Sequence, residues 1–320
     1  MDWLQKALAD APSQIALMRP VPTVVGGRTL LVDGDYLAYY AAGNDDTDPG
    51  RARQNAREKI QAFCTFSGAD RVVIHLTAST SNKGHRFAIA KTKPYQAQRS
   101  GKKPRNWQHL RAWLETYQGD EFKTKLWYDR EADDGMAYHA AVLGDTAAVI
   151  ATADKDMRMF SGLHIDWQDY HVVHVNPGTF ELVDEESGKV FGHKWFWLQM
   201  LQGDTADNIP GLPFYVREGK PRRIGKATAS KLLSNCANNR QAFDTVSGLY
   251  ASFYKEEWPE RFAEQAALLW MRTDQRAELD DFLVVVPEDD YEIRADIIHA
   301  AGNIECEIIE MQNAVEALEK

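Results

Sequence analysis

Short apolar runs rich in β-branched residues alternate with segments of helical spacing along the first half of the chain. The apolar runs predict strands at residues 29–32, 70–78, 122–128 and 146–152. The spacing between them predicts helices at residues 51–66, 106–118 and 131–143. Because strands that alternate with helices form mainly parallel sheets flanked by those helices, we expect an α/β fold. After residue 202 the sequence becomes mostly helical.

Carboxylates follow the ends of these predicted strands. Asp33 ends the first run, Glu131 follows the third, and Asp154 and Asp156 follow the fourth. The carboxyl ends of parallel strands form one crevice, in which ligands bind. We therefore expect acids that are distant in sequence to converge at one edge of the sheet.

Clustered carboxylates without histidine or cysteine are the oxygen ligands that Mg²⁺ and Mn²⁺ prefer. Two such ions, about 4 Å apart, can hold a phosphodiester, generate hydroxide and stabilise the leaving oxygen. Bound metal also offsets the repulsion that would otherwise drive some carboxylates to take up protons. The three cysteines, Cys64, Cys236 and Cys306, lie far apart, which argues against a zinc site and fits a reducing compartment.

The basic residues are clustered, although the net charge of the chain is −10. No acid occurs between Asp70 and Glu115, a stretch that holds many bases. A second basic stretch, residues 216–231, holds a single acid. Local patches rather than the net charge meet phosphates, so nucleic acid is a plausible partner.

The beginning of the chain carries acids where a signal peptide would have a basic start, and no apolar run approaches the roughly 20 residues that a membrane span needs. We expect an N-terminal extension over residues 1–28, in which a short amphipathic helix can end before Pro20. No membrane association is expected.

Four acidic motifs occur in a fixed order. They are "VDGD" (32–35), "EADD" (131–134), "TADKDM" (152–157) and "LQGDTADNIPG" (201–211). In this order they resemble the flap endonuclease and 5′→3′ exonuclease superfamily, and the layout looks most like that of podophage replication exonucleases. The resemblance covers about residues 29–233. Each motif is weak alone, whereas the ordered set is highly specific.

The resemblance implies a PIN/flap-endonuclease-like fold. Its nuclease domain would span residues 29–202 and include an arch at about 79–105. A helix–three-turn–helix module and a helical C-terminal region would span residues 203–320.

The resemblance also implies an activity. A metal-dependent phosphodiesterase would act at 5′ ends, nicks, gaps and flaps of DNA, with an RNase H-like ability to remove RNA primers. It would be a monomer with two Mg²⁺ or Mn²⁺ ions and would work in DNA replication and repair. The expected location is the cytoplasm of a bacterial or phage-infected cell.

The matching motif positions give the site residues that the resemblance implies. Metal ligands close to the scissile phosphate would be Asp33, Glu131, Asp133 and Asp156. Residues that bind metal directly or through water would be Asp134 and Asp154. The pair that completes the second metal site would be Asp204 and Asp207. Asp35 has no secure family role, and we predict it to be a helix N-cap.

Two positions depart from the pattern of the family. Ala78 stands where the family usually carries an acid after the second strand. In "YQAQR" (95–99), Gln96 stands where the arch of the family carries a lysine that positions the phosphate. Candidate substitutes for that lysine are Arg86, Lys91 and Lys93.

The stretch "DNIPG…IGKATASKLL" resembles the helix–three-turn–helix module, in which relatives bind K⁺ next to the duplex. Gly211 and Gly225 would let backbone N–H groups face a phosphate, and the helix that follows would favour an anion. This chain inserts "LPFYVREGKPRR" (212–223), which could lengthen the phosphate track or form a solvated basic loop.

The expected DNA contacts are sequence-independent, with Tyr95 as a stacking surface. They are Lys83, Arg86, Tyr95, Arg99, Lys102, Lys103, Arg105, Gly211, Arg222, Arg223, Gly225 and Lys226.

Two alternatives stay open. A haloacid-dehalogenase-type phosphatase would use Asp33 as nucleophile and Asp35 as acid, but it leaves "EADD" and "ADKD" without a role. A catalytically weakened, structure-specific DNA-binding protein would explain Ala78 and Gln96.

Overall fold

The computed structural model describes residues 19–98, 101–217 and 219–318. These residues form two compact units, one holding 19–80 with 101–179 and the other 81–98 with 180–318. Most of the expected arch and residues 180–202 therefore cluster with the C-terminal half of the chain. The helix expected before Pro20 lies outside the described residues.

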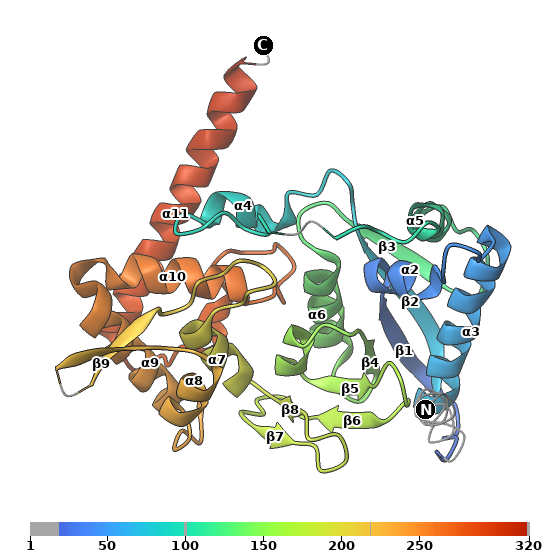
Figure 1. The fold of residues 1–320 in the computed structure, drawn as a ribbon, viewed down its shortest axis with the longest axis horizontal. Helices are drawn as coiled ribbons and strands as arrows, with labels where there is room; N and C mark the ends of the chain where they lie inside the picture. Colours follow the sequence, from blue (N-terminus) through green and yellow to red (C-terminus); the bar gives the residue numbers. More distant parts are fainter. Residues whose placement is uncertain (1–18, 99–100, 218, 319–320) are drawn as a thin grey trace, which may run out of the picture. The chain divides into compact units, whose positions relative to one another are not determined.

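The first unit contains a six-stranded sheet with the strand order β3-β2-β1-β4-β5-β6 (Figure 1). Its strands are β1 Val25–Asp33, β2 Ala69–Thr77, β3 Lys123–Trp127, β4 Ala148–Ala151, β5 Gly162–Ile165 and β6 Val172–Val175. All neighbouring pairs are parallel except β5 with β6. The prediction of a mainly parallel sheet is confirmed, and β1 to β4 are the four predicted strands.

Helices cover both faces of this sheet. They are α2 Gly34–Ala41, α3 Pro49–Ser67, α5 Trp107–Glu115 and α6 Ala132–Leu143, and a 3₁₀ turn spans Asp156–Met159. Helices α2, α3 and α5 pack against one another, and α6 packs on the other face of the sheet (Figure 1). The predicted helices at 51–66, 106–118 and 131–143 correspond to α3, α5 and α6.

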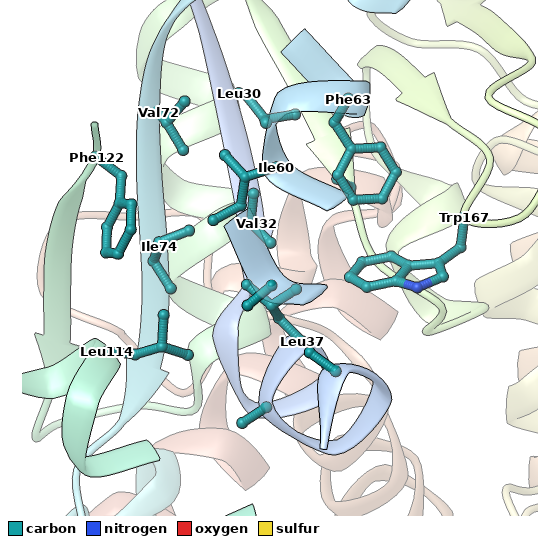
Figure 2. Packing of buried hydrophobic residues seen from close by; sticks show 14 of the residues in the cluster. Leu30, Val32, Leu37, Ile60, Phe63, Val72, Ile74, Leu114, Phe122 and Trp167 are labelled. Atoms are coloured by element: carbon teal, nitrogen blue, oxygen red, sulfur yellow. The ribbon is translucent and has the colours of Figure 1, made fainter. Parts of the chain in front are cut away.

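Alternate residues of the strands form the core beneath α3. Leu30 and Val32 of β1 pack with Ile60 and Phe63 of α3, and Trp167 closes the end of this cluster (Figure 2). Successive residues of a strand point to opposite faces, so each face of β1 is buried. Burial of such a side chain stabilises the fold by about 1.5–3 kcal/mol, and the core thereby fixes where β1 ends, at Asp33.

The direction of the strand order reverses between β1 and β4. The chain passes from β1 to β2 and then to β3 with α2, α3 and α5 on one face. It then returns through α6, on the other face, to β4 on the far side of β1. Such a reversal opens a crevice at the carboxyl ends of the two strands, and Asp33 lies at the carboxyl end of β1.

The second unit is mainly helical, as predicted. Its helices are α4 Arg86–Ile89, α7 Lys194–Gln202, α8 Lys226–Leu232, α9 Asn239–Tyr254, α10 Trp258–Leu269 and α11 Tyr291–Leu318, with 3₁₀ turns at Lys83–His85, Lys255–Glu257 and Asp281–Val285. Helix α8 lies in the stretch that resembles the helix–three-turn–helix module. Among the described residues, no helix combines the length and the apolar character needed to cross a bilayer.

Two small antiparallel sheets complete the second unit. One pairs β7 Leu182–Val183 with β8 Val190–Phe191, and the other pairs β9 Phe214–Arg217 with β10 Lys220–Arg223. The second pair occupies the insertion between Gly211 and Gly225. The insertion is therefore a β-hairpin, because its residues pair across a turn at Gly219, whose φ is +70°.

Two helical glycines differ in the space around them, which leads to opposite expectations for alanine. A Cβ at Gly135 of α6 would lie 2.0 Å from Trp127 Nε1, the atom that donates to His75 Nδ1. Gly135→Ala should therefore lower the free energy of unfolding by about 1–3 kcal/mol, because overpacking outweighs helix propensity. Gly248 of α9 has no atom within 4 Å of its added Cβ, and Gly248→Ala should raise that free energy by about 1 kcal/mol. Urea denaturation followed by circular dichroism would measure both, and shifts of the same sign would contradict this account.

Candidate active site

Asp33 lies where β1 ends and α2 begins. Its Oδ1 accepts a hydrogen bond from the backbone N–H of Tyr36 (3.0 Å), so Asp33 is the N-cap of α2. Its Oδ2 accepts one from the hydroxyl of Thr152 (3.0 Å), the residue after β4. The side chain of Asp33 therefore connects the two strands between which the sheet order reverses.

Thr152 joins Asp33 to the next two acids. Its hydroxyl oxygen accepts from the backbone N–H of Asp154 (3.0 Å), and Asp154 Oδ1 accepts from the N–H of Asp156 (2.8 Å). The Lys155 ammonium lies 3.2 Å from Asp156 Oδ1. The turn after β4 thus presents two carboxylates beside Asp33.

A second group of acids occupies the N-terminus of α6. One carboxylate oxygen each from Glu131, Asp133 and Asp134 lies within 4.8 Å of the others. Glu131 is the N-cap, and its backbone N–H donates to Asp134 Oδ2 (2.9 Å). The partial positive charge of a helix N-terminus favours carboxylates at this position.

The end of β2 connects the two groups. The Thr77 N–H donates to Asp35 Oδ2 (3.1 Å), and the Thr77 hydroxyl oxygen accepts from the N–H of Ala132, the first residue of α6 (2.9 Å). The Arg111 guanidinium lies 3.2 Å from Asp35 Oδ1. The prediction of Asp35 as an N-cap was wrong, because Asp33 caps α2 and the Asp35 carboxylate binds the end of β2 instead.

The six acids of the first unit that were expected to bind metal therefore lie in two hydrogen-bonded groups at the carboxyl edge of the sheet, one at the ends of β1 and β4 and the other at the N-terminus of α6. They are Asp33, Glu131, Asp133, Asp134, Asp154 and Asp156. Their role as metal ligands stays a prediction. Thr77, Thr152, Asp35 and Arg111 were not singled out from the sequence as parts of this network. The available signal was weak, namely a threonine at or just after each of two strand ends.

The electrostatics of this edge favour a cation. Burial, together with the negative charges of Asp35 and Asp154, raises the pKa of Asp33 to about 7. At neutral pH an acid with this pKa is protonated about half the time unless a positive charge stabilises its ionised form. The donors are carboxylate oxygens, which suit Mg²⁺ or Mn²⁺ better than zinc. The residues present therefore fit the metal that the motifs imply.

Ala78 is buried at the end of β2, and its N–H donates to the carbonyl of Trp127 (2.8 Å). The nearby Asp35 carboxylate reaches the N–H of Thr77, one residue away. Asp35 thus brings a carboxylate to the strand end at which the acid of the family is missing.

Asp204 and Asp207 belong to the second unit, on a loop that follows α7. Asp204 is buried, and its backbone exchanges two hydrogen bonds of 2.8 Å with Ile209, which closes the loop. Gly203 and Gly211 make this closure possible, since a Cβ at Gly211 (φ +62°) would lie 2.3 Å from Gly203 N.

The arch segment packs against this acidic loop. The N–H of Gln96 donates to the carbonyl of Asp207 (2.9 Å), and the Asn208 side-chain amide donates to the carbonyl of Pro94 (2.8 Å). The Lys83 ammonium donates to Gln96 Oε1 (2.9 Å). An ammonium group therefore lies beside the residue that replaces the arch lysine of the family.

Other arch residues lie elsewhere than the sequence suggested. Arg86 is buried and donates to the carbonyls of Leu268 (3.3 Å) and Trp270 (3.1 Å), so its guanidinium anchors the arch instead of meeting a phosphate. Lys91 forms an ion pair with Glu307, whereas Lys93 is exposed.

The aromatic residues of the arch also differ from expectation. Tyr95 is only 4% exposed and packs against the edge of Phe87, at a ring distance of 5.5 Å. It is therefore a core residue rather than an exposed stacking surface. Phe87, at 58% exposure, is the ring of this pair that faces solvent.

The basic residues that follow the arch belong to the first unit. Lys103 stacks its ammonium over the ring of Trp107 (3.5 Å), and Arg105 donates to the carbonyl of Asp45 (2.8 Å). Lys102 is exposed, and Arg99 lies outside the described residues.

In the helix–three-turn–helix region, Gly211 does not offer its N–H to solvent. That N–H donates to Gln265 Oε1 (3.0 Å) in a buried position. The glycine therefore helps to close the loop and does not present its N–H to a phosphate. Gly225 is exposed and precedes α8, and Arg222, Arg223 and Lys226 are exposed beside it.

Comparison with known proteins supports the resemblance. A 5′-3′ exonuclease of Buchnera aphidicola subsp. Schizaphis graminum is 22% identical over 253 residues, which cover 77% of this chain and 79% of the relative. No protein-family model matches the chain.

Solved structures share the fold. The T5 5′-exonuclease with bound zinc ions superposes with a TM-score of 0.51 over 87% of this chain and 98% of that one, at 15% identity. The T5 D15 protein co-crystallised with metal ions gives 0.50 over 85% and 99%, at 16% identity. The fold that the resemblance to the flap endonuclease and 5′→3′ exonuclease superfamily implies is thereby confirmed.

The hydroxyl of Thr152 holds the carboxylate of Asp33 and the backbone N–H of Asp154, which leads to a prediction about cation affinity. Thr152→Val should weaken Mn²⁺ binding about tenfold, the usual cost of losing a partner that orients metal ligands. Isothermal titration calorimetry would measure the affinity. Thr116→Val is the control, because that hydroxyl bonds only within its own helix segment and lies on an exposed residue. Equal Mn²⁺ affinities of the two variants would contradict the assigned role of Thr152.

Proposed function

We propose that this chain, which resembles the flap endonuclease and 5′→3′ exonuclease superfamily in motifs and fold, is a structure-specific, metal-dependent 5′→3′ exonuclease and flap endonuclease. The observation that carries the proposal is the network of carboxylates at the reversal point of the parallel sheet. The sequence relative, a 5′-3′ exonuclease, has the same activity in its name.

The metal ligands are proposed from the same network. Asp33, Glu131, Asp133 and Asp156 would bind the ions directly, and Asp134 and Asp154 directly or through water. Asp204 and Asp207 would complete the second position, as the motif resemblance implies. When bound, two Mg²⁺ or Mn²⁺ ions supply positive charge to the attacking and leaving oxygens of the phosphodiester.

The protein side chains orient this chemistry. Thr152 holds the carboxylates of Asp33 and the backbone of Asp154 in one arrangement. Asp134 fixes the backbone of Glu131 through a hydrogen bond of 2.9 Å. Such preorganisation lets the charged groups act without rearrangement when negative charge develops on the phosphate.

Lys83 is the residue proposed to position the scissile phosphate. Its ammonium is oriented by Gln96, which the backbone of Asp207 holds in turn. Lys93 is exposed and can assist, whereas the buried contacts of Arg86 and the ion pair of Lys91 leave these two less suited.

The substrate is proposed to be DNA with 5′ ends, nicks, gaps or flaps, and also RNA–DNA hybrid at primers. Sequence-independent contacts would come from Lys102, Lys103, Arg105, Arg222, Arg223, Gly225 and Lys226, with K⁺ at the turn before α8. The protein would act as a monomer in the cytoplasm of a bacterial or phage-infected cell.

A product-length assay tests this proposal. Blunt, nicked, gapped, flapped and RNA-primed substrates with a 5′ label are incubated with and without Mg²⁺ or Mn²⁺. The proposal expects short 5′ products only when the metal is present, with flaps and nicks preferred over blunt duplexes. Uncut substrates of every kind would refute it.

The same assay separates the alternatives. A phosphatase would hydrolyse a small phosphomonoester and leave DNA uncut, but the ion pair of Asp35 with Arg111 disfavours its use as a general acid. A catalytically weakened binding protein would shift flap DNA in a gel without cutting it.

Asp156 provides a direct test of the ligand role. Asp156→Asn should lower the rate of flap cleavage by about 10²–10³-fold or more, because one metal loses a charged ligand. Binding of flap DNA in metal-free buffer should stay unchanged. Asp120→Asn, an exposed acid of the same unit, serves as the control. Cleavage by Asp156→Asn at the rate of the unaltered protein would exclude the assigned role.

The role of Lys83 is tested by its replacement. Lys83→Met should lower the cleavage rate at saturating DNA on the order of 10²-fold, because the developing phosphate charge loses a fixed cation. Exposed Lys255, replaced in the same way, serves as the control. Single-turnover kinetics would measure both, and equal rates would assign the missing lysine contact to another residue.

A further inference from the structure

The hairpin inserted between Gly211 and Gly225 forms one wall of a hollow on the second unit. The hollow has a volume of about 850 Å³, and α8 forms its other wall. Its lining residues are Tyr215, Arg222 and Arg223 from the hairpin and Ala227, Thr228, Lys231 and Leu232 from α8.

The described residues that line this hollow carry only positive charge. Three of them are basic and none is acidic. Within the described part of the chain, Arg222, Arg223 and Lys231 have no side-chain hydrogen bond or ion pair. By contrast, Arg240 and Arg261 of the same unit each pair with carboxylates. Like charges that share a hollow repel one another, so an anion placed between them would be stabilised.

The wall formed by the hairpin is fixed in place rather than a solvated loop. Its base is closed by a hydrogen bond from Ile224 N–H to the carbonyl of Pro213 (3.1 Å), and Phe214 stacks on Phe253 of α9 at 6.5 Å between ring centres. Tyr215 and Arg222 are direct cross-strand partners, so their side chains share one face of the hairpin. A site with fixed walls loses less entropy on binding than a loop that must become ordered.

The lining groups favour a phosphodiester backbone as the ligand. Guanidinium, ammonium and hydroxyl groups donate hydrogen bonds, and phosphate oxygens accept them. Binding of unpaired bases requires exposed aromatic faces, and among the described residues that line the hollow only Tyr215, itself partly exposed, is aromatic. The contact is therefore expected to be independent of base sequence.

The position of the hollow on α8 relates it to the rest of the DNA track. Lys226 begins the helix and Lys231 lies five residues further on, a rise of roughly 8 Å at 1.5 Å per residue. Arg223 and Ala227, which flank the Gly225–Lys226 turn, also line the hollow. A strand that meets this turn would therefore lie beside the hollow.

We propose that this hollow binds the phosphodiester backbone of the duplex arm of the substrate, with Tyr215 and Lys231 as contacts that join Arg222 and Arg223. The proposal rests on the proposed function and adds a site built by the insertion. In this proposal the insertion binds the duplex arm of the substrate and does not bind the 5′ single strand.

A salt titration of DNA binding tests the proposal. The full chain is bound in metal-free buffer to a flap substrate with a long duplex arm, over a series of KCl concentrations. Arg222→Gln combined with Lys231→Gln removes two charges, so the slope of log affinity against log salt should become shallower by about 1.8, at roughly 0.9 per phosphate contact. The control, Lys255→Gln combined with Arg276→Gln, removes two exposed charges of the same unit outside the hollow and should keep the original slope.

A second arm varies the substrate. With stepwise shorter duplex arms, the unaltered protein should lose affinity once the arm no longer reaches the hollow, and the double variant should lack this step. A loss that is equal on single-stranded oligonucleotides would show that the hollow binds the single strand and would overturn the assignment. Matching thermal melts of the two double variants exclude misfolding as the cause.

The failure of this inference differs from the failure of the proposed function. If the slope of the double variant equals that of the control while flap cleavage by the unaltered protein persists, the hollow does not bind DNA and the nuclease assignment stands. If the unaltered protein neither binds nor cleaves any flap substrate, both are refuted.

Discussion

Repulsion between carboxylates is the constraint on which this structure depends. Six acids of one unit share an edge of the sheet, and burial together with the negative charges of Asp35 and Asp154 raises the pKa of Asp33 to about 7. The fold tolerates this charge by giving the acids backbone donors: Tyr36 N–H for Asp33, Asp156 N–H for Asp154 and Glu131 N–H for Asp134. The core beneath α3 keeps the strand ends, and hence these donors, in place. These hydrogen bonds offset only part of the negative charge of the carboxylates, and a divalent cation can neutralise the rest.

In the second unit, the groups proposed to bind DNA lie on and around one loop. Asp204 and Asp207 lie on a loop that is closed by the approach of Gly203 and Gly211. The arch segment, with Lys83 and Gln96, packs against that loop instead of folding as part of the sheet unit. The hairpin insertion and α8 belong to the same unit. The groups proposed to grip and position DNA are thus built mainly on one scaffold, and most carboxylates on the other.

The sequence predicted the sheet and the acids at its edge because both follow from short-range rules. Short apolar runs rich in β-branched residues indicate strands such as residues 70–78, and parallel strands place their carboxyl ends together. The burial of Arg86 could not be predicted, because it depends on carbonyls of Leu268 and Trp270, which lie far along the chain. The burial of Tyr95 was missed because no local pattern indicates that its ring packs against Phe87. The pairing of the insertion was missed for a similar reason, since proline and arginine are weak strand formers and Phe253 of α9 supports the hairpin.

At both positions that depart from the family motifs, a neighbouring side chain carries the charge that the motif residue lacks. At Ala78 the missing carboxylate has a neighbour in Asp35, which reaches the same strand end from α2. At Gln96 the missing ammonium has a neighbour in Lys83, which the glutamine itself orients. Chemistry at a phosphate depends on where charge lies and how firmly it is held, and not on which residue of the chain supplies it. A substitution at a motif position therefore indicates lost activity only when no neighbouring side chain brings the same charge to the same place.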